Sequence, residues 1–339
     1  MSKYLGIGGR YAISRFWTHK PIFLTHSVTS KCNCQCQICD VWRRESATKE
    51  LTTSEILRML EEARKLNFVG YIAFGGEPLL RPDIVDILTR AHNLQLYTSV
   101  ITNGTYLSQY ADEIAKVTDL TWVSLDYDSK YHDIMRGTPG VYEKVLRGII
   151  DLKRARGRIA INCVLSRLNI DAVPKMGKLA QKLGVKIAFD PMEVFPGCNE
   201  RIALTLSQRQ QIFAQIASIK EEGYPVLNSD DFIKFNQKRE HYNCAQPRIF
   251  LKVYEDGKVR PFWCQKNTDV IGDLTKQSLS EFLHSPAYKE FRKKAWTCCL
   301  CGNSCQVETS MFYSVKVFLM RLFQRKNSIL KFIMNYAGN

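Results

Sequence analysis

The sequence predicts an α/β protein, in which a partial (β/α)6 barrel is followed by a small cysteine-rich domain and a basic amphipathic C-terminal helix. Two observations predict this fold. Between residues 22 and 191, short apolar segments alternate with amphipathic segments of helical spacing, which is typical of parallel strands joined by right-handed crossovers. Beyond residue 240 the alternation ends and cysteines gather. The active site of such a barrel is expected at the C-terminal ends of its strands.

The barrel elements follow from periodicity. Strands are predicted at 22–28, 71–74, 96–102, 120–126, 159–165 and 185–190. Helices are predicted between them at 54–66, 82–92, 108–117, 141–155 and 172–183. Thr52 and Glu55 have the spacing of a capping box at the start of the first of these helices.

The second part of the chain has a different pattern. A linking helix is predicted at 205–222, a hairpin at 249–263 that turns at Asp256-Gly257, and one helix at 278–294. The predicted divisions are a basic amphipathic segment (1–21), the barrel (22–200), a linking region (201–235), the cysteine-rich domain (236–309) and a basic amphipathic tail (310–339).

The net charge of +15 predicts an acidic partner, such as nucleic acid, an anionic membrane surface or a phosphorylated substrate. Residues 1–31 and 310–339 each contain five Lys or Arg and no acid. Both ends are also rich in large apolar residues, which suits a helix lying in a membrane interface, or else a terminal helix packed on the barrel. No nucleic-acid-binding module is recognised, so nucleic acid is disfavoured. Without a signal peptide or an 18-residue apolar run, a cytoplasmic protein is expected, peripheral on the inner face of the membrane if its ends bind lipid.

The chain has 12 cysteines, clustered at 32–39 and 298–305. Clustered thiols without an export signal are typical of metal ligands rather than disulfides. Cys32, Cys36 and Cys39 follow the first predicted strand, and three thiolates can hold an iron–sulfur cubane with one iron left open for a small ligand. Zinc is the alternative, and Cys34 is a fourth thiol that could close the site.

Further motifs follow the next three strands: Gly75-Gly76-Glu77-Pro78, Thr102-Asn103-Gly104 and Ser124-Leu125-Asp126. In this order, with the Cys-x3-Cys-x2-Cys motif, they resemble the radical S-adenosylmethionine (radical SAM) superfamily over residues 22–191. The resemblance implies a [4Fe–4S] cluster chelated by the methionine end of SAM. It also implies reductive cleavage of SAM to a 5′-deoxyadenosyl radical that abstracts a substrate hydrogen, with a low-potential electron donor such as ferredoxin or flavodoxin.

Glycines allow a backbone to approach a ligand amino group closely, and Glu77 can add a charge-assisted hydrogen bond to it. By resemblance, Ser124 and Arg136 hold the methionine carboxylate or the ribose. Asn162 is expected near the adenosine, whereas Asn169 is expected to cap a turn. The expected cofactor-binding residues are Gly75, Gly76, Glu77, Pro78, Thr102, Asn103, Ser124, Asp126, Arg136 and Asn162.

A second cysteine set resembles the SPASM/twitch extension of many radical SAM enzymes and implies one auxiliary [4Fe–4S] cluster, with a zinc knuckle as the alternative. Its expected ligands are Cys244, Cys264, Cys298, Cys301 and Cys305, and Cys299 is a further candidate. Cys163 is expected in the core. Cys198 is expected to be a loop thiol, or alternatively a hydrogen-atom donor to a substrate radical.

The favoured hypothesis is an enzyme that acts on an unactivated C–H bond of a membrane lipid or isoprenoid, because the layout of the N-terminus is similar to that of hopanoid-associated radical SAM proteins. Peptide maturation and alcohol dehydrogenation are the alternatives within the same class. A non-catalytic iron–sulfur electron carrier is the alternative from another class. The sequence identifies no catalytic side chain.

Overall fold

The computed structural model describes residues 9–10, 13–43, 49–195, 197–238, 241–261, 269–298 and 301–313. Six parallel strands form a curved sheet in chain order, which confirms the predicted fold class. They are β1 (Phe23–Ser27), β2 (Gly70–Phe74), β3 (Tyr97–Thr102), β4 (Leu120–Ser124), β5 (Ile159–Leu165) and β6 (Lys186–Pro191). Each lies within two residues of its predicted bounds.

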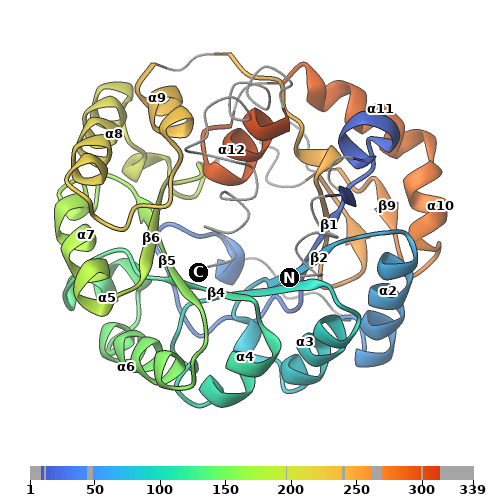
Figure 1. Ribbon diagram of the computed structural model, residues 1–339, viewed down its shortest axis with the longest axis horizontal. Helices are drawn as coiled ribbons and strands as arrows, with labels where there is room; N and C mark the ends of the chain where they lie inside the picture. Colours follow the sequence, from blue (N-terminus) through green and yellow to red (C-terminus); the bar gives the residue numbers. More distant parts are fainter. Residues whose placement is uncertain are drawn as a thin grey trace.

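Helices cover the outside of this sheet (Figure 1). They are α2 (Thr53–Lys65), α3 (Ile84–Asn93), α4 (Ala111–Val117), α5 (Tyr131–Arg136), α6 (Val141–Arg154) and α7 (Ala172–Leu183), followed by α8 (Leu206–Glu221) and α9 (Asp230–Lys238). The predicted capping box of Thr52 and Glu55 is present. The short helices α5 and α9 were not predicted.

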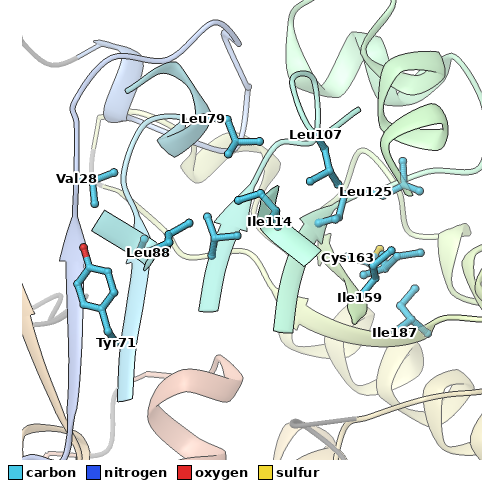
Figure 2. Close-up of a cluster of buried hydrophobic side chains, with 14 of the residues drawn as sticks. Val28, Tyr71, Leu79, Leu88, Leu107, Ile114, Leu125, Ile159, Cys163 and Ile187 are labelled. Atoms are coloured by element: carbon cyan, nitrogen blue, oxygen red, sulfur yellow. The ribbon is translucent and has the colours of Figure 1, made fainter. Parts of the chain in front are cut away.

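The main core lies between the outer face of the sheet and these helices, and Figure 2 shows part of it, including Tyr71, Leu88 and Cys163. Burial of such side chains contributes about 1.5–3 kcal/mol each before ordering costs. Strand residues on the other face, such as Ile72 and Trp122, stay partly exposed. The sheet is therefore packed on its helical side, and its other face carries a smaller apolar cluster, against which Trp122 packs, together with some partly exposed residues.

The cysteine-rich region continues the same sheet. Strand β7 (Phe250–Val253) pairs parallel with β1, and β8 (Lys258–Val259) and β9 (Gly272–Asp273) follow antiparallel, which gives the order β6-β5-β4-β3-β2-β1-β7-β8-β9. The predicted hairpin is present with its turn at Gly257, whose φ is 78°. Its second strand is shorter than predicted, and residues 262–268 lie outside the described part.

The prediction of a single helix over 278–294 is wrong. The structure has α10 (Leu279–His284) and α11 (Pro286–Trp296), separated at Ser285. Pro286 has no N–H to continue the first helix, but it fits the first turn of the next one, where Ser285 accepts a hydrogen bond from the Tyr288 amide.

The last described helix, α12 (Ser304–Tyr313), lies between α9 and α11 in Figure 1. The Ser304 amide and hydroxyl bond to Asp190 of β6, and the Ser310 hydroxyl accepts from the Ala245 amide ahead of β7. Helix α12 thus links the two sides of the open barrel, and it crosses the boundary predicted at 309. Residues 314–339, where the amphipathic tail was predicted, are outside the described residues. None of the described helices is long and apolar enough to cross a membrane.

Candidate functional site

Three loops meet at the C-terminal ends of β1, β2 and β3. The amides of Gly76 and Glu77 donate to the carbonyls of Thr29 and Lys31, each at 2.8 Å. The Asn103 side chain donates to Asn33 Oδ1 at 2.8 Å. The cysteine loop, the Gly-Gly-Glu-Pro loop and the Thr-Asn-Gly loop are therefore one connected unit.

Gly76 is needed for this connection. A Cβ atom built on Gly76 would collide with the backbone carbonyl of Lys31. The structure thus explains this glycine by a close approach to the cysteine loop, where the sequence predicted an approach to a ligand. A ligand contact of its backbone carbonyl stays a prediction.

Glu77 is fully buried and bound by its own chain. Its Oε1 atom accepts from the Thr102 hydroxyl at 2.7 Å and the Leu79 amide at 3.0 Å, and its Oε2 atom accepts from the Asn103 amide at 2.6 Å. Burial raises the pKa of this carboxyl to about 7, although these three hydrogen bonds oppose the shift. Leu79 belongs to the short helix η3 (Pro78–Leu80). Glu77 therefore positions the loops after β2 and β3.

Helix α5 fixes the cysteine loop from the other side. The amides of Gln35 and Gln37, which flank Cys36, donate to the carbonyls of Arg136 and Met135 at 3.0 Å each. The helix ends at Gly137, whose φ is 60°, and a Cβ atom there would collide with the Gln35 carbonyl. The end of α5 thus determines the path of the backbone around Cys36.

The Arg136 side chain lies between Asp126 and Cys36. Its Nη2 atom is 2.6 Å from Asp126 Oδ2, and its Nη1 atom is 3.8 Å from Cys36 Sγ. A hydrogen bond from Cys34 and the Arg136 charge lower the pKa of the Cys36 thiol to about 6, against the opposing effect of burial. The sequence placed Asp126 and Arg136 at a ligand, and the structure adds this contact with the cysteine loop.

The other two cysteines of the predicted triad differ from Cys36. Burial raises the pKa of Cys32, and it raises the pKa of Cys39 to about 12. The Asn103 side-chain amide, 4.0 Å from Cys32 Sγ, and the Cys34 backbone amide donate to Cys32, and the Val41 amide donates to Cys39 Sγ at 3.5 Å. Within the described ranges, no group of three or more His, Cys, Asp or Glu side chains is arranged to hold a single metal ion.

The residues present fit the two groups that the motifs imply. Soft thiols are the ligands of iron–sulfur clusters, and this loop holds four, of which the motif assigns Cys32, Cys36 and Cys39 as ligands. Ser124 and Asn162 are neighbours in register on β4 and β5, at the end of the sheet where the loops meet. The Arg136 Nε and Asn162 Oδ1 atoms are buried and have no hydrogen-bond partner in the structure. A donor and an acceptor without partners at this edge suit a polar ligand.

Three other predicted residues have clear surroundings. Asn169 is buried, donates to the carbonyls of Asp126 and Val164 at 3.0 Å, and accepts from the Ser166 amide, as a turn cap does. Cys163 is in the core. Cys198 Sγ accepts from Arg43 Nη1 at 3.0 Å, and this contact was not predicted.

Part of the second cysteine set lies together. The Cys244 amide donates to the Cys298 carbonyl at 3.2 Å, and Tyr242 donates to the Cys301 carbonyl at 3.4 Å. Cys305 is exposed in the first turn of α12. The predicted ligands Cys264 and Cys299 lie outside the described residues.

Sequence reasoning missed Lys252. This lysine of β7 is 3% exposed, and its Nζ atom lies 4.9 Å from the ring centroid of Phe74 and 4.2 Å from that of Tyr254. It is paired in register with Thr25 of β1. The sequence held a signal for this lysine, because it lies between Leu251 and Val253 in a predicted strand. Side chains alternate between the two faces of a strand, so Lys252 lies on the face opposite to these two apolar residues.

Comparisons with known proteins identify two domains in the chain. A family described as "Radical SAM superfamily" matches residues 26–180, and an "Iron-sulfur cluster-binding domain" of the SPASM type matches residues 244–306. The chain is 26% identical to a PqqA peptide cyclase of Granulibacter bethesdensis, over 81% of this chain and 77% of that protein. It is 32% identical to an AdoMet-dependent heme synthase of Methanosarcina barkeri, over 49% of each chain.

Solved structures share the fold. Streptococcus suis SuiB bound to S-adenosylmethionine superposes with a TM-score of 0.68 at 14% identity, over 84% of this chain and 72% of that one. Native anSMEcpe with bound AdoMet superposes with a TM-score of 0.67 at 18% identity, over 92% and 99%. These matches extend over both the barrel and the cysteine-rich region. The chain therefore contains a radical SAM domain at residues 26–180 and a C-terminal SPASM domain at residues 244–306.

Proposed function

We propose that this radical SAM enzyme abstracts a hydrogen atom from a C–H bond of a peptide and so modifies that peptide. The superfamily uses SAM and a [4Fe–4S] cluster, and the SPASM domain adds auxiliary iron–sulfur chemistry. A cluster held by the cysteine loop would supply, after reduction by a low-potential donor, the single electron for cleavage of SAM to methionine and a 5′-deoxyadenosyl radical. Every other task falls to the residues of the chain.

Cys32, Cys36 and Cys39 hold the open cluster in this proposal, and Cys34 does not. The Nη1 atom of Arg136 contacts Cys36 and its Nη2 atom lies beside Asp126, whereas its buried Nε atom is near neither and can donate to a ligand oxygen. Ser124 and Asn162 offer a hydroxyl and an amide beside it. Glu77 acts indirectly, because its hydrogen bonds hold the Thr102 and Asn103 loop in place.

The main support for a peptide substrate is the share of this chain that is similar to a PqqA peptide cyclase. The match to a PqqA peptide cyclase covers 81% of this chain, whereas the match to the heme synthase covers 49%. The sheet also carries a buried acceptor without a hydrogen-bond partner, the Oδ1 atom of Asn162. A hydrocarbon would leave this atom unpaired, which is costly, whereas a peptide amide can donate to it.

The test is formation of 5′-deoxyadenosine by anaerobically reconstituted enzyme with SAM and a reductant, in the presence of peptide or lipid extracts from cells that lack the gene. Peptide extract is expected to stimulate the reaction and to yield a peptide of altered mass. Stimulation by the lipid extract alone would contradict the peptide assignment. Mass spectrometry of peptides and lipids from cells with and without the gene gives an independent answer.

A lipid substrate at a membrane surface is the second candidate, and one contact favours it. His19 Nδ1 lies 2.7 Å from the Tyr313 hydroxyl. This contact joins the two regions of the chain, residues 1–31 and 310–339, that are basic and contain no acid. Arg292 Nη1 donates to the His19 carbonyl at 2.6 Å and adds a cation there. Sedimentation with anionic liposomes tests this candidate.

A further inference from the structure

The charge of Arg136 is held at the sulfur of Cys36. Arg136, Asp126 and Cys36 are 7%, 0% and 6% exposed, and the guanidinium bridges the carboxylate at 2.6 Å and the sulfur at 3.8 Å. Because water is excluded, charges at this place act more strongly on each other than they do at a surface. The Asp126 carboxylate is held in turn by the Val164 amide, which donates to its Oδ1 atom at 2.9 Å.

Cys36 also has a second donor. The fully buried side chain of Cys34 hydrogen-bonds to that of Cys36. The donors at the other two sulfurs are all neutral amides: the Asn103 side chain at 4.0 Å and the Cys34 backbone at Cys32, and the Val41 backbone at 3.5 Å at Cys39. Among the described residues, Cys36 alone of the three therefore has a cationic hydrogen-bond donor at its sulfur.

The backbone makes this arrangement rigid. The Arg136 carbonyl accepts from the Gln35 amide at 3.0 Å, so the residue that contacts the sulfur of Cys36 also holds the backbone beside it. Gly137 allows the close approach. The backbone bond places Arg136 beside the cysteine loop, and the ion pair with Asp126 orients its side chain.

We propose that Arg136, held by Asp126, and Cys34 together raise the reduction potential of the open cluster by donating to the sulfur of Cys36. Reduction adds one electron from an external low-potential donor and makes or breaks no bond. Hydrogen bonds and positive charge at a ligand sulfur stabilise the added negative charge, which makes reduction easier. This inference rests on the proposed ligand set of Cys32, Cys36 and Cys39.

The test is a redox titration of the reconstituted full-length enzyme, followed by electron paramagnetic resonance in the absence of SAM. The signal of the Cys32→Ala/Cys36→Ala/Cys39→Ala variant is subtracted to remove the auxiliary cluster. The variant Arg136→Met/Asp126→Asn removes the cation without leaving a buried carboxylate unpaired. Its equilibrium constant for one-electron reduction is expected to fall at least tenfold, which equals a potential lower by 59 mV.

Two further variants keep the inference testable if the double variant does not fold. Cys34→Ala is expected to lower the potential, whereas Cys34→Ser keeps a donor and should stay near the wild type. Arg147→Met, on the exposed face of α6, is the matched loss of a distant cation and should not change the potential. A wild-type potential in both the double variant and Cys34→Ala, at full iron content, would overturn the inference. A wild-type iron content in Cys36→Ala would instead overturn the ligand set.

Discussion

The backbone amide of Asn103 donates a 2.6 Å hydrogen bond to Glu77 Oε2, and this bond joins the loop after β3 to the loop after β2. Glu77 is the acidic residue of the Gly-Gly-Glu-Pro motif, and its buried carboxyl also accepts from the Thr102 hydroxyl and the Leu79 amide. Its burial therefore makes the stability of the site depend on its protonation.

We expect the cluster-free chain to lose stability as the pH rises from 4.5 to 7 because of Glu77. The folded-state pKa is raised from 4.5 to about 7, so the stabilising contribution of the protonated carboxyl is present below pH 4.5 and is lost as the pH passes the folded-state value. The free energy of unfolding should fall by about 3 kcal/mol in all. Denaturant unfolding at several pH values should show that Glu77→Gln lacks this pH dependence. If the free energy of unfolding changes with pH equally in the variant and the wild type, the prediction is wrong.

The second prediction concerns the open cluster. Cys36→Ala should abolish the cleavage of SAM to 5′-deoxyadenosine without unfolding the barrel. Cys34→Ala should retain most of the activity, because Cys34 contacts Cys36 and is not a ligand in the proposed site. Measurement of 5′-deoxyadenosine together with bound iron checks both variants. If Cys34 proves as essential as Cys36, the three-ligand assignment is wrong.

The barrel could be predicted from the sequence because its signals are local. The strands β1–β6 coincide with short segments rich in apolar, aromatic or β-branched residues, and the helices between them have clear periodicity. Helix α5 escaped prediction since six residues are too few to show a period, and α10 and α11 were merged since their periodicities run on across Ser285.

The contacts that shape the site could not be predicted in the same way. The motifs placed Glu77 and Arg136 at one edge of the sheet, but the partners of their side chains depend on tertiary packing. The Arg136–Cys36 contact spans 100 residues, and the Glu77–Asn103 bond spans 26. Residue types and spacing do not determine whether a buried polar group pairs with a ligand or with another residue of the chain.

The third prediction uses two glycines with similar backbones. Gly137 and Gly140 have φ values of 60° and 75°, so alanine strains the backbone at both, at a cost of about 1 kcal/mol. A Cβ atom at Gly137 would also collide with the Gln35 carbonyl, whereas nothing lies within 4 Å of one at Gly140. Gly137→Ala should therefore displace the cysteine loop and lower the iron content, while Gly140→Ala should keep it. Equal iron in the two variants would show that α5 does not position the loop.

The fourth prediction concerns the SPASM domain. Two cubanes of four irons correspond to about eight irons per chain. Replacement of Cys32, Cys36 and Cys39 together should leave about four, held by Cys244 and other cysteines of the second set. Iron analysis of that triple variant checks this, with Cys198→Ala as the control that should keep the full count. Stoichiometric zinc in place of the remaining iron would show that the second set is a zinc site.

The last prediction separates a membrane-binding tail from a structural one. Truncation at Ser310 would also remove Tyr313, which contacts His19, and the Ser310 hydroxyl that accepts from the Ala245 amide. Truncation after Tyr313 removes only residues 314–339, which contain five Lys or Arg and no acid. If these residues bind the bilayer, each cation contributes about 1 kcal/mol at an anionic surface, and this contribution weakens with salt.

We therefore expect truncation after Tyr313 to leave the melting temperature unchanged and to remove most of the sedimentation with anionic liposomes. Truncation at Ser310 should also lower the melting temperature, because it breaks contacts that hold α12 to the barrel. A matched full-length variant with the five tail cations changed to Gln tests charge apart from apolar burial, and it should lose the salt-dependent part of the binding. Should truncation after Tyr313 destabilise the fold and leave liposome binding intact, the tail is a structural element, and a lipid substrate loses its main support.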